Sequence, residues 1–214
     1  MPKPHKEDCL RSVDKAAQIL HGALPEFLHH GYARTSMDRI ASAAGVSKQT
    51  LYSYFSDKNG LFTALVEQMA AQKFRLVWSQ PLQGEPEVAL RTLAQRLLQE
   101  VNDEEYLCFV RLIVAESKTR PDLAQLFLSN VAQPAIAALT RYLEQRREQS
   151  TVADCRPGSA DTEATARIFV GSLIHFLFTQ EILSGKAIMP FSQERLIDTL
   201  IELVVPQRQR SSLN

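Results

Sequence analysis

The chain of 214 residues has few cysteines, no excess of charge of either sign and no long apolar run. Its three cysteines, Cys9, Cys108 and Cys155, are an odd number at wide spacings, which is untypical of a disulfide framework and fits a reducing compartment. The 24 basic and 24 acidic residues balance, so the molecule as a whole carries no electrostatic sign of a nucleic-acid or membrane partner. Any such partner must be recognised by a local patch.

Targeting and membrane signals are also missing. The amino-terminal segment MPKPHKEDCLR is charged and no apolar stretch follows it, so we expect no signal peptide and a cytoplasmic protein. The most apolar stretch, Ile168 to Leu183, has 16 residues and is interrupted by polar ones. A bilayer span needs about 20 mostly apolar residues. We therefore expect a buried helix here and no membrane partner.

Signatures of catalysis and metal binding do not occur either. The chain contains no GxSxG, P-loop or dinucleotide-binding glycine pattern, so we expect no enzyme and no cofactor. Cys9, His29 and His30 lack the spacing of metal ligands, and no metal site is predicted. Cys108 falls in an apolar helical segment and Cys155 in a polar loop, which favours packing for the first and an exposed thiol for the second. Redox sensing by a cysteine stays an open alternative.

Helical periodicity runs through nearly the whole chain, and no alternating pattern of a strand is convincing. The sequence predicts an all-α protein with a three-helix unit at the N-terminus and a larger helical domain, about nine to ten helices in all. A segment rich in proline and glycine, residues 79–87, is the clearest break in the helical pattern and follows the fourth expected helix. We expect domains at residues 1–60 and 61–214, and helices at residues 11–30, 37–44, 48–55, 57–78, 87–102, 104–118, 122–130, 135–149, 161–184 and 192–205.

The first helix carries an unusual proline. Pro25 removes the amide that would bond to the His21 carbonyl, so a kink or break is expected between Gly22 and Pro25. Gly31 is expected to end this helix as a C-terminal cap.

The segment from Thr35 to Glu67 is the most informative part of the sequence. Thr35 is expected to cap a helix, with Asp38 returning the bond as a capping box. Gly45 stands where the chain must turn through a left-handed conformation, and Ser47 is placed to cap the next helix. Leu51 then anchors that helix on the core. This spacing indicates a helix-turn-helix unit.

The second helix of this unit has the layout of a recognition helix. With Leu51 inward and about 100° per residue, Gln49 and Ser53 point outward, flanked by Lys48 with Tyr52 and by Thr50 with Tyr54. Outward side chains can reach base edges in a major groove, and Gln49 can pair bidentately with adenine. Residues 1–60 hold eight basic and six acidic side chains, so the positive excess is small and binding would rest on a few placed contacts.

Residues 15–67 resemble the DNA-binding domain of the TetR/AcrR family of transcriptional regulators, with GYARTSMDRIASAAGVSKQTLYSYFSDKNGLF matching the family signature nearly position by position. The resemblance implies that Lys48, Gln49 and Ser53 face bases. It implies phosphate contacts for Thr35, Thr50, Tyr52, Tyr54 and Lys58.

The segment RLIVAESKTRPDLAQLF, residues 111–127, is similar to the regulatory domain of the AefR-like branch of the same family. The resemblance implies a homodimer joined by the last two long helices, a palindromic double-stranded operator and a small-molecule effector. The dimer interface is expected to include Phe169, Leu173, Leu177, Leu196, Leu200 and Ile201. The effector pocket is expected to be lined by Phe74, Trp78, Phe109, Ile113, Phe127, His175 and Phe176.

These features predict a homodimeric, ligand-responsive repressor that a small, lipophilic effector releases from its operator. Two alternatives stay open: a DNA-binding protein of the same fold that answers to no small molecule, and a helical ligand carrier or enzyme without DNA function. Taken one at a time, the aromatic residues named for the pocket fit an ordinary core better than a pocket, and the pocket follows from the resemblance.

Overall fold

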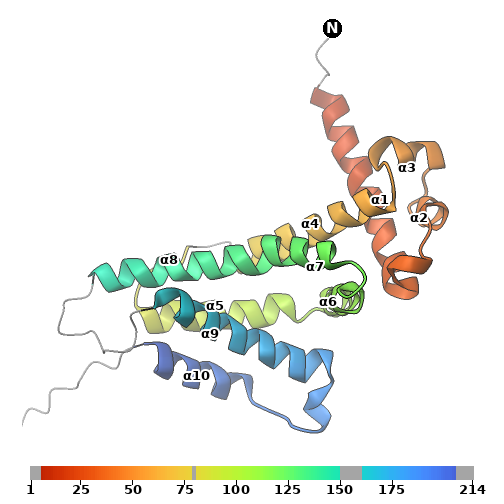
Figure 1. Ribbon diagram of the computed structural model, residues 1–214. Coiled ribbons are helices and arrows are strands. Elements are labelled where there is room, and N and C mark those ends of the chain that lie inside the picture. The colour runs from red at the N-terminus through yellow and green to blue at the C-terminus, as the bar shows by residue number, and fades with distance from the viewer. Residues whose placement is uncertain (1–5, 79–80, 150–160, 206–214) are drawn as a thin grey trace, which may run out of the picture. The chain divides into compact units, whose positions relative to one another are not determined.

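The computed structural model describes residues 6–78, 81–149 and 161–205, with side chains from residue 15 onward (Figure 1). Helices make up nearly all of these ranges, and none of them contains a strand. The prediction of an all-α protein is confirmed.

The helices begin and end close to the predicted positions. They are α1 (Lys6–Arg34), α2 (Met37–Ala43), α3 (Lys48–Tyr54), α4 (Lys58–Val77), α5 (Pro86–Val101), α6 (Glu104–Glu116), α7 (Pro121–Phe127), α8 (Gln133–Gln149), α9 (Thr162–Leu177) and α10 (Gln193–Val204). Two π-helical segments, η1 (Leu128–Ala132) and η3 (Phe178–Ile182), follow α7 and α9, and a short 3-10 turn, η4 (Gly185–Ala187), comes before α10.

Helix α1 departs from its prediction at Pro25. The helix continues through Pro25, and its non-helical dihedral angles lie at Gly31, with φ 72° and ψ 166°. A break between Gly22 and Pro25 is therefore wrong. The helical path is interrupted at Gly31, as expected, but helical residues resume after it and run to Arg34. Ile19, Ala23 and Phe27 are fully buried on either side of the proline. Their burial offsets the hydrogen bond that proline removes, because large apolar side chains each gain about 1.5–3 kcal/mol when buried.

The chain forms two compact units. Unit 1 comprises Met1–Ala70 and Cys108–Phe127, and unit 2 comprises Ala71–Leu107 and Leu128–Asn214. The predicted domain boundary after residue 60 stays a prediction. The two units also show that one segment from the second half of the chain belongs with the N-terminal helices, which the predicted domains did not include. The segment Cys108–Phe127, which holds most of α6 and all of α7, packs with the N-terminal helices.

Unit 1 is built around an aromatic cluster. The Phe27 and Phe62 rings meet edge to face with centroids 4.8 Å apart, and Tyr32 lies 5.1 Å from Phe62. Phe109 from α6 extends the cluster, with its centroid 6.5 Å from that of Phe62. Because Phe27, Phe62 and Phe109 are fully buried, α1, α4 and α6 share one core.

Unit 2 is a helical bundle in which α9 packs on α5, α8 and α10, and α10 packs on α5 (Figure 1). Its core draws mainly on leucines of α5 and on one face each of α9 and α10. Among the described residues, one helical stretch, Pro121–Gln149, is long and apolar enough to cross a membrane by length and composition alone. One such stretch is weak support for a span, since helices in the cores of soluble proteins meet the same criterion. The apolar stretch Ile168 to Leu183 does not meet it.

Candidate nucleic-acid interface

Helix α2 begins one residue later than the capping prediction requires. The Ser36 hydroxyl accepts a hydrogen bond from the Arg39 amide at 3.3 Å, so Ser36 is the N-cap. Thr35 is only 2% exposed, and its hydroxyl reaches the carbonyls of Glu26, at 3.0 Å, and Gly31, at 2.8 Å. The predicted capping box between Thr35 and Asp38 is therefore wrong. A phosphate contact by the Thr35 side chain stays a prediction, although this conformation turns the hydroxyl inward.

The turn between α2 and α3 has the predicted construction. Gly45 has φ 64°, the left-handed conformation that glycine adopts without a steric penalty. The Ser47 hydroxyl accepts from the Thr50 amide at 3.0 Å and caps α3, and Leu51 is fully buried. From α1, the Gln18 amide donates to the Ala44 carbonyl at 2.8 Å and fixes the end of α2. The helix-turn-helix is thus held by its caps, by the bond from Gln18 and by buried side chains of both helices.

A glycine that sequence reasoning overlooked sets how closely α1 and α2 cross. A Cβ atom at Gly22 would lie 2.6 Å from the Ala44 Cα atom and 2.7 Å from its nitrogen. These are backbone atoms that a rotamer change cannot move, so any side chain at Gly22 would force the helices apart. Such a small residue at a buried helical position was the signal that could have revealed this contact.

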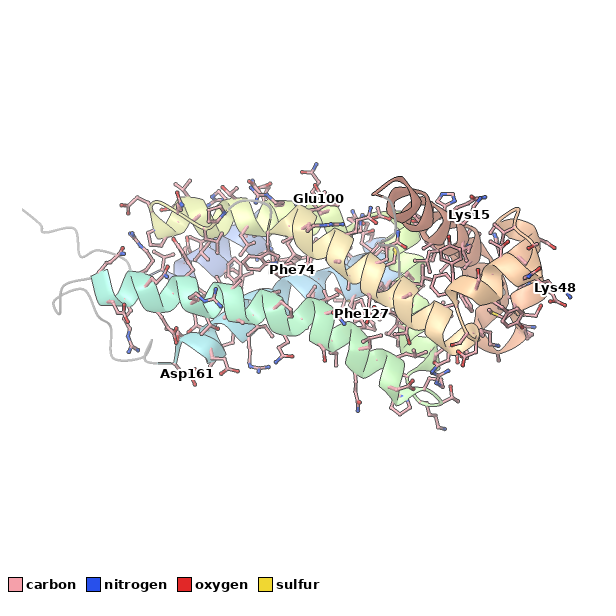
Figure 2. All side chains as sticks on the ribbon, turned by 90° about the horizontal axis from the view of Figure 1, so that it is seen from above. Lys15, Lys48, Phe74, Glu100, Phe127 and Asp161 are labelled. Carbon is pink, nitrogen blue, oxygen red and sulfur yellow. The ribbon has the colours of Figure 1, made fainter. Side chains whose placement is uncertain are left out.

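The outer face of α3 carries the predicted base-reading residues. Lys48, Gln49, Tyr52 and Ser53 are exposed, while Thr50 and Tyr54 are half-buried. In Figure 2, Lys48 points outward from α3. The α3 side chains therefore form a polar surface around Gln49, supported from below by Leu51.

Several of these side chains already have partners. The Lys48 ammonium lies 2.7 Å from the Asp38 carboxylate, and both side chains are more than half exposed, at 65% and 60%. The Thr50 and Ser47 hydroxyls are 2.8 Å apart, and the Ser53 hydroxyl donates to the Thr50 carbonyl at 2.7 Å. An exposed ion pair contributes only about 0–1 kcal/mol, so Lys48 can leave Asp38 at little cost.

Lys58, at the start of α4, is held more firmly. Its ammonium donates to the carbonyls of Tyr32, Ala33 and Thr35 at 2.8, 3.2 and 2.9 Å, and it lies 4.5 Å from the centroid of the Tyr32 ring. The cation thereby satisfies carbonyls at the end of α1, where the helix dipole favours positive charge. The predicted phosphate contact of Lys58 would have to replace one of these bonds, and it stays a prediction.

The residues predicted to line an effector pocket are divided between the two units. Phe109, Ile113 and Phe127 belong to unit 1, where the Phe109 and Phe127 centroids are 6.4 Å apart. Phe74 and Trp78 belong to unit 2 and stack with centroids 6.0 Å apart. Phe176 lies in the core of unit 2, but His175 is exposed. The prediction of one pocket lined by all seven residues stays untested.

The residues predicted for the dimer interface are mostly buried within unit 2. Five of the six side chains are core residues of unit 2 with at most 4% of their surface exposed, namely Phe169, Leu173, Leu177, Leu200 and Ile201. Side chains covered to this extent within their own chain have little surface to give to a partner. Only Leu196 is partly exposed. The assignment of these residues to the interface stays a prediction, because α9 is apolar on two faces and periodicity does not say which face the chain itself covers.

Unit 2 contains a partly buried charged cluster that sequence reasoning missed. The Lys73 side chain of α4 is mostly buried, donates to the Glu100 carbonyl at 2.8 Å and forms an ion pair with Asp103. The ammonium lies 5.2 Å from the centroid of the Tyr106 ring. Burial, reinforced by the Asp103 charge, raises the pKa of Tyr106 above its ordinary value. The cluster joins α4 to the turn between α5 and α6.

The titratable residues considered as metal ligands are separated. His30 lies 3.7 Å from the Glu26 carboxylate, His29 is exposed and Cys108 is a half-buried free thiol. Within the described part of the chain, no group of three or more His, Cys, Asp or Glu side chains could hold a metal ion. Cys155 and the side chain of Cys9 lie outside the described residues.

Two protein families match the chain. The family described as bacterial regulatory proteins, tetR family, matches residues 19–65. The AefR-like transcriptional repressor, C-terminal domain, matches residues 88–205. The first match contains the helix-turn-helix, and the second extends from α5 to the end of α10.

Curated proteins with similar sequences are regulators of the same kind. The HTH-type transcriptional repressor SCO4008 of Streptomyces coelicolor is 40% identical over 52 residues, 24% of this chain and 27% of that protein. The chain thus matches about a quarter of the length of that relative. The HTH-type transcriptional repressor Rv1474c of Mycobacterium tuberculosis is 26% identical over 157 residues, 73% of this chain and 78% of that protein.

Solved structures are similar over nearly the whole chain. A TetR-family transcriptional regulator from Mesorhizobium loti superposes with a TM-score of 0.74 at 28% identity, covering 91% of this chain and 96% of that chain. The flavonoid-responsive regulator FrrA superposes with a TM-score of 0.67 at 29% identity, covering 88% and 92%. With the AefR-like domain covering more than half of its length and the helix-turn-helix preceding it, the chain belongs to the TetR family of bacterial transcriptional regulators.

Proposed function

We propose that this regulator is a homodimeric repressor that reads a palindromic operator through α3 and is released from it by a small lipophilic effector. The observation that carries the DNA-reading role is the outer face of α3. Gln49 is exposed there, on a helix whose opposite side is anchored by the fully buried Leu51. No described residue forms a hydrogen bond with the Gln49 side chain, so its amide is available to a base edge.

Other α3 residues fit supporting roles. Lys48 and Ser53 flank Gln49 and are exposed, which suits base or groove contacts. Thr50, Tyr52 and Tyr54 stand at the sides of the helix, where their hydroxyls can donate to the phosphates that wall the groove. Because each contact is single and the charge excess is small, we expect specificity to depend strongly on Gln49.

The test is selection of binding duplexes from a random DNA library by the full chain, followed by affinity measurements with variants. Gln49→Ala should weaken binding to the selected operator by about 1–3 kcal/mol while leaving binding to scrambled DNA unchanged. Gln99→Ala removes another exposed glutamine, on α5, and should change neither affinity. Equal losses on both DNAs for Gln49→Ala would refute the base-reading assignment.

Dimerisation is proposed through apolar side chains that unit 2 leaves uncovered. Ile168, Ile174 and Phe178 are 59%, 45% and 37% exposed and follow one another along one face of α9 and η3. Gly171 lies between them, with no atom within 4 Å of the position its Cβ would take. On α10, Leu203 is 74% exposed. A second copy of the chain would cover these residues, because a two-fold axis pairs identical surfaces and gives the two reading heads that a palindrome requires.

The effector response is proposed from the AefR-like domain and from the likeness to FrrA, which is described as flavonoid-responsive. Trp78, the only tryptophan, stacks on Phe74 and reports on unit 2. Titration with flavonoids and other lipophilic compounds should quench its fluorescence and release DNA with the same concentration dependence. Tight DNA binding that no compound in the panel reverses would favour the alternative of a regulator without a small-molecule effector.

A further inference from the structure

Arg120 lies at the corner between α6 and α7, within the sequence matched by the AefR-like regulatory domain. This corner nevertheless belongs to the same compact unit as the helix-turn-helix. Arg120 is therefore a residue of the regulatory sequence placed among the helices that carry the DNA-reading face.

The Arg120 guanidinium has three partners from three segments. Its Nε and Nη2 atoms lie 3.0 and 2.7 Å from the Asp122 carboxylate oxygens in a bidentate pair. Nη2 also donates to the side-chain oxygen of Asn59 at the start of α4. The guanidinium carbon lies 4.8 Å from the centroid of the Tyr32 ring, near the end of α1. The Arg120 hydrogen bond lowers the pKa of Asp122 below its ordinary value.

Tyr32 is the point where these segments meet. It directly follows the break at Gly31, its ring lies 4.5 Å from the Lys58 ammonium, and it packs against Phe27 and Phe62 in the core. The residues after the break are therefore restrained by one cation from α4 and another from the α6–α7 corner. Cations over an aromatic face are attracted by its quadrupole, and arginine adds a planar fork that fixes direction.

The pattern of contacts distinguishes Arg120 from an ordinary surface arginine. An exposed pair with Asp122, two residues away, would contribute little alone. The contacts with Asn59 and Tyr32 instead join parts of the chain 61 and more residues apart, and the Arg120 side chain is only 23% exposed.

We infer that Arg120 is a positioning residue for DNA recognition. Through Tyr32 and Asn59 it fixes the end of α1 and the start of α4 against the α6–α7 corner. This restraint limits the angles at which α3 is presented to DNA. This inference rests on the proposed function. In a dimer, a head with restricted angles fits one half-site spacing, whereas a loosened head tolerates others.

The test uses the full chain and two duplexes: the operator that the wild type selects from a random library, and the same operator with one base pair inserted between the half-sites. Wild type should lose at least about tenfold in affinity on the insertion. Arg120→Met, which keeps the stem but removes the charged fork, should bind the selected operator more weakly and lose no more than about threefold on the insertion. Arg120→Lys, which keeps the cation over Tyr32, should restore part of the wild-type penalty.

Two further variants control the experiment. Lys118→Met removes a charge from the same corner, and among the described residues no hydrogen bond or ion pair joins Lys118 to α1 or α4. Its insertion penalty should equal that of wild type. Asn59→Ala removes the α4 partner without touching Arg120, so it should also reduce the penalty and replaces Arg120→Met if that variant does not fold. If Arg120→Met and Asn59→Ala lose as much affinity on the insertion as wild type does, and any weaker binding is equal on both duplexes, the inference is overturned while the proposed function stands. Failure of wild type to select any duplex would overturn the proposed function and the inference with it.

Discussion

Replacing Lys58 by methionine separates two roles that the sequence alone does not distinguish. A lysine that contacts a DNA phosphate contributes to affinity and to its salt dependence, but little to stability. A lysine whose ammonium binds carbonyls at the end of a helix contributes mainly to stability. Methionine keeps most of the apolar stem and removes only the charged donor.

The magnitude follows from the contacts of the ammonium. Two of its three hydrogen bonds, with the carbonyls of Tyr32 at 2.8 Å and Thr35 at 2.9 Å, are partly buried, and the third is exposed. Hydrogen bonds to charged groups contribute about 1.5–3 kcal/mol each, but water replaces part of what is lost at a half-exposed site. We expect Lys58→Met to lower the free energy of unfolding by about 2–3 kcal/mol, which corresponds to about 4–12 °C in melting temperature for a chain of this length.

Lys48→Met is the matched control. The Lys48 ion pair with Asp38 is exposed on both sides, so its removal should change the free energy of unfolding by less than about 1 kcal/mol. On DNA the order reverses. Lys48→Met should reduce the slope of log affinity against log salt by about 0.9 for each protomer, whereas Lys58→Met should leave the slope unchanged.

Thermal unfolding followed by circular dichroism and salt titrations of operator binding measure both quantities. An unchanged melting temperature for Lys58→Met, together with a flatter salt dependence, would show that the ammonium leaves the carbonyls for a phosphate. The capping role assigned to Lys58 would then be refuted.

Three other changes test the packing, the interface and the titration of this protein. Ile174→Glu should convert the proposed dimer to a monomer, as measured by analytical ultracentrifugation. Val88→Glu, at an exposed apolar position of α5, is the control and should leave the dimer intact. An Ile174→Glu variant that remains dimeric would contradict the proposed interface. Gly22→Ala should lower the free energy of unfolding, measured with denaturant, by up to about 2 kcal/mol, since overpacking costs about 1–3 kcal/mol and the helix propensity of alanine recovers only about 1 kcal/mol. Gly60→Ala is the control, because its Cβ would lie 3.6 Å from its neighbours, and it should not destabilise the protein. Equal effects of the two substitutions would count against the close crossing of α1 and α2. The raised pKa of Tyr106 contributes stability that is intact below pH 10.0, the ordinary pKa of tyrosine, and is lost as pH rises toward the folded-state value. Above pH 10 the free energy of unfolding should therefore fall less in Tyr106→Phe than in wild type. Identical dependence on pH in the two proteins would contradict the assigned burial.

Much of the fold follows from local sequence patterns. Helix limits in the helix-turn-helix agree with prediction because Gly45, Ser47 and Leu51 act on residues within one turn of themselves. Glycine supplies the left-handed turn, serine caps the next helix and leucine gives the buried face. The outward direction of Gln49 then follows from helical geometry alone.

The cap of α2 shows where local patterns become ambiguous. Thr35 and Ser36 are both good N-cap residues, and either could begin the helix. The choice depends on carbonyls that α1 brings near Thr35, those of Glu26 and Gly31. Bonded there, Thr35 is buried and Ser36 takes the cap.

The faces of α9 show the same limit for apolar residues. Periodicity identifies a helix that is apolar on two sides but does not say which side its own chain covers. The bundle buries Phe169 and Leu173 and leaves Ile168 and Ile174 exposed, which moves the proposed dimer interface to the other face.

The sequence by itself determined the helical class, the limits of most helices, the helix-turn-helix and the outward face of α3, because each depends on neighbours within a few residues. Only the tertiary structure decided the partners of Lys58, the close crossing at Gly22 and the contacts of Arg120 with Asn59 and Tyr32. These join residues 22 or more positions apart, and charge, size and hydrogen-bonding capacity do not specify a distant partner until packing brings the two together.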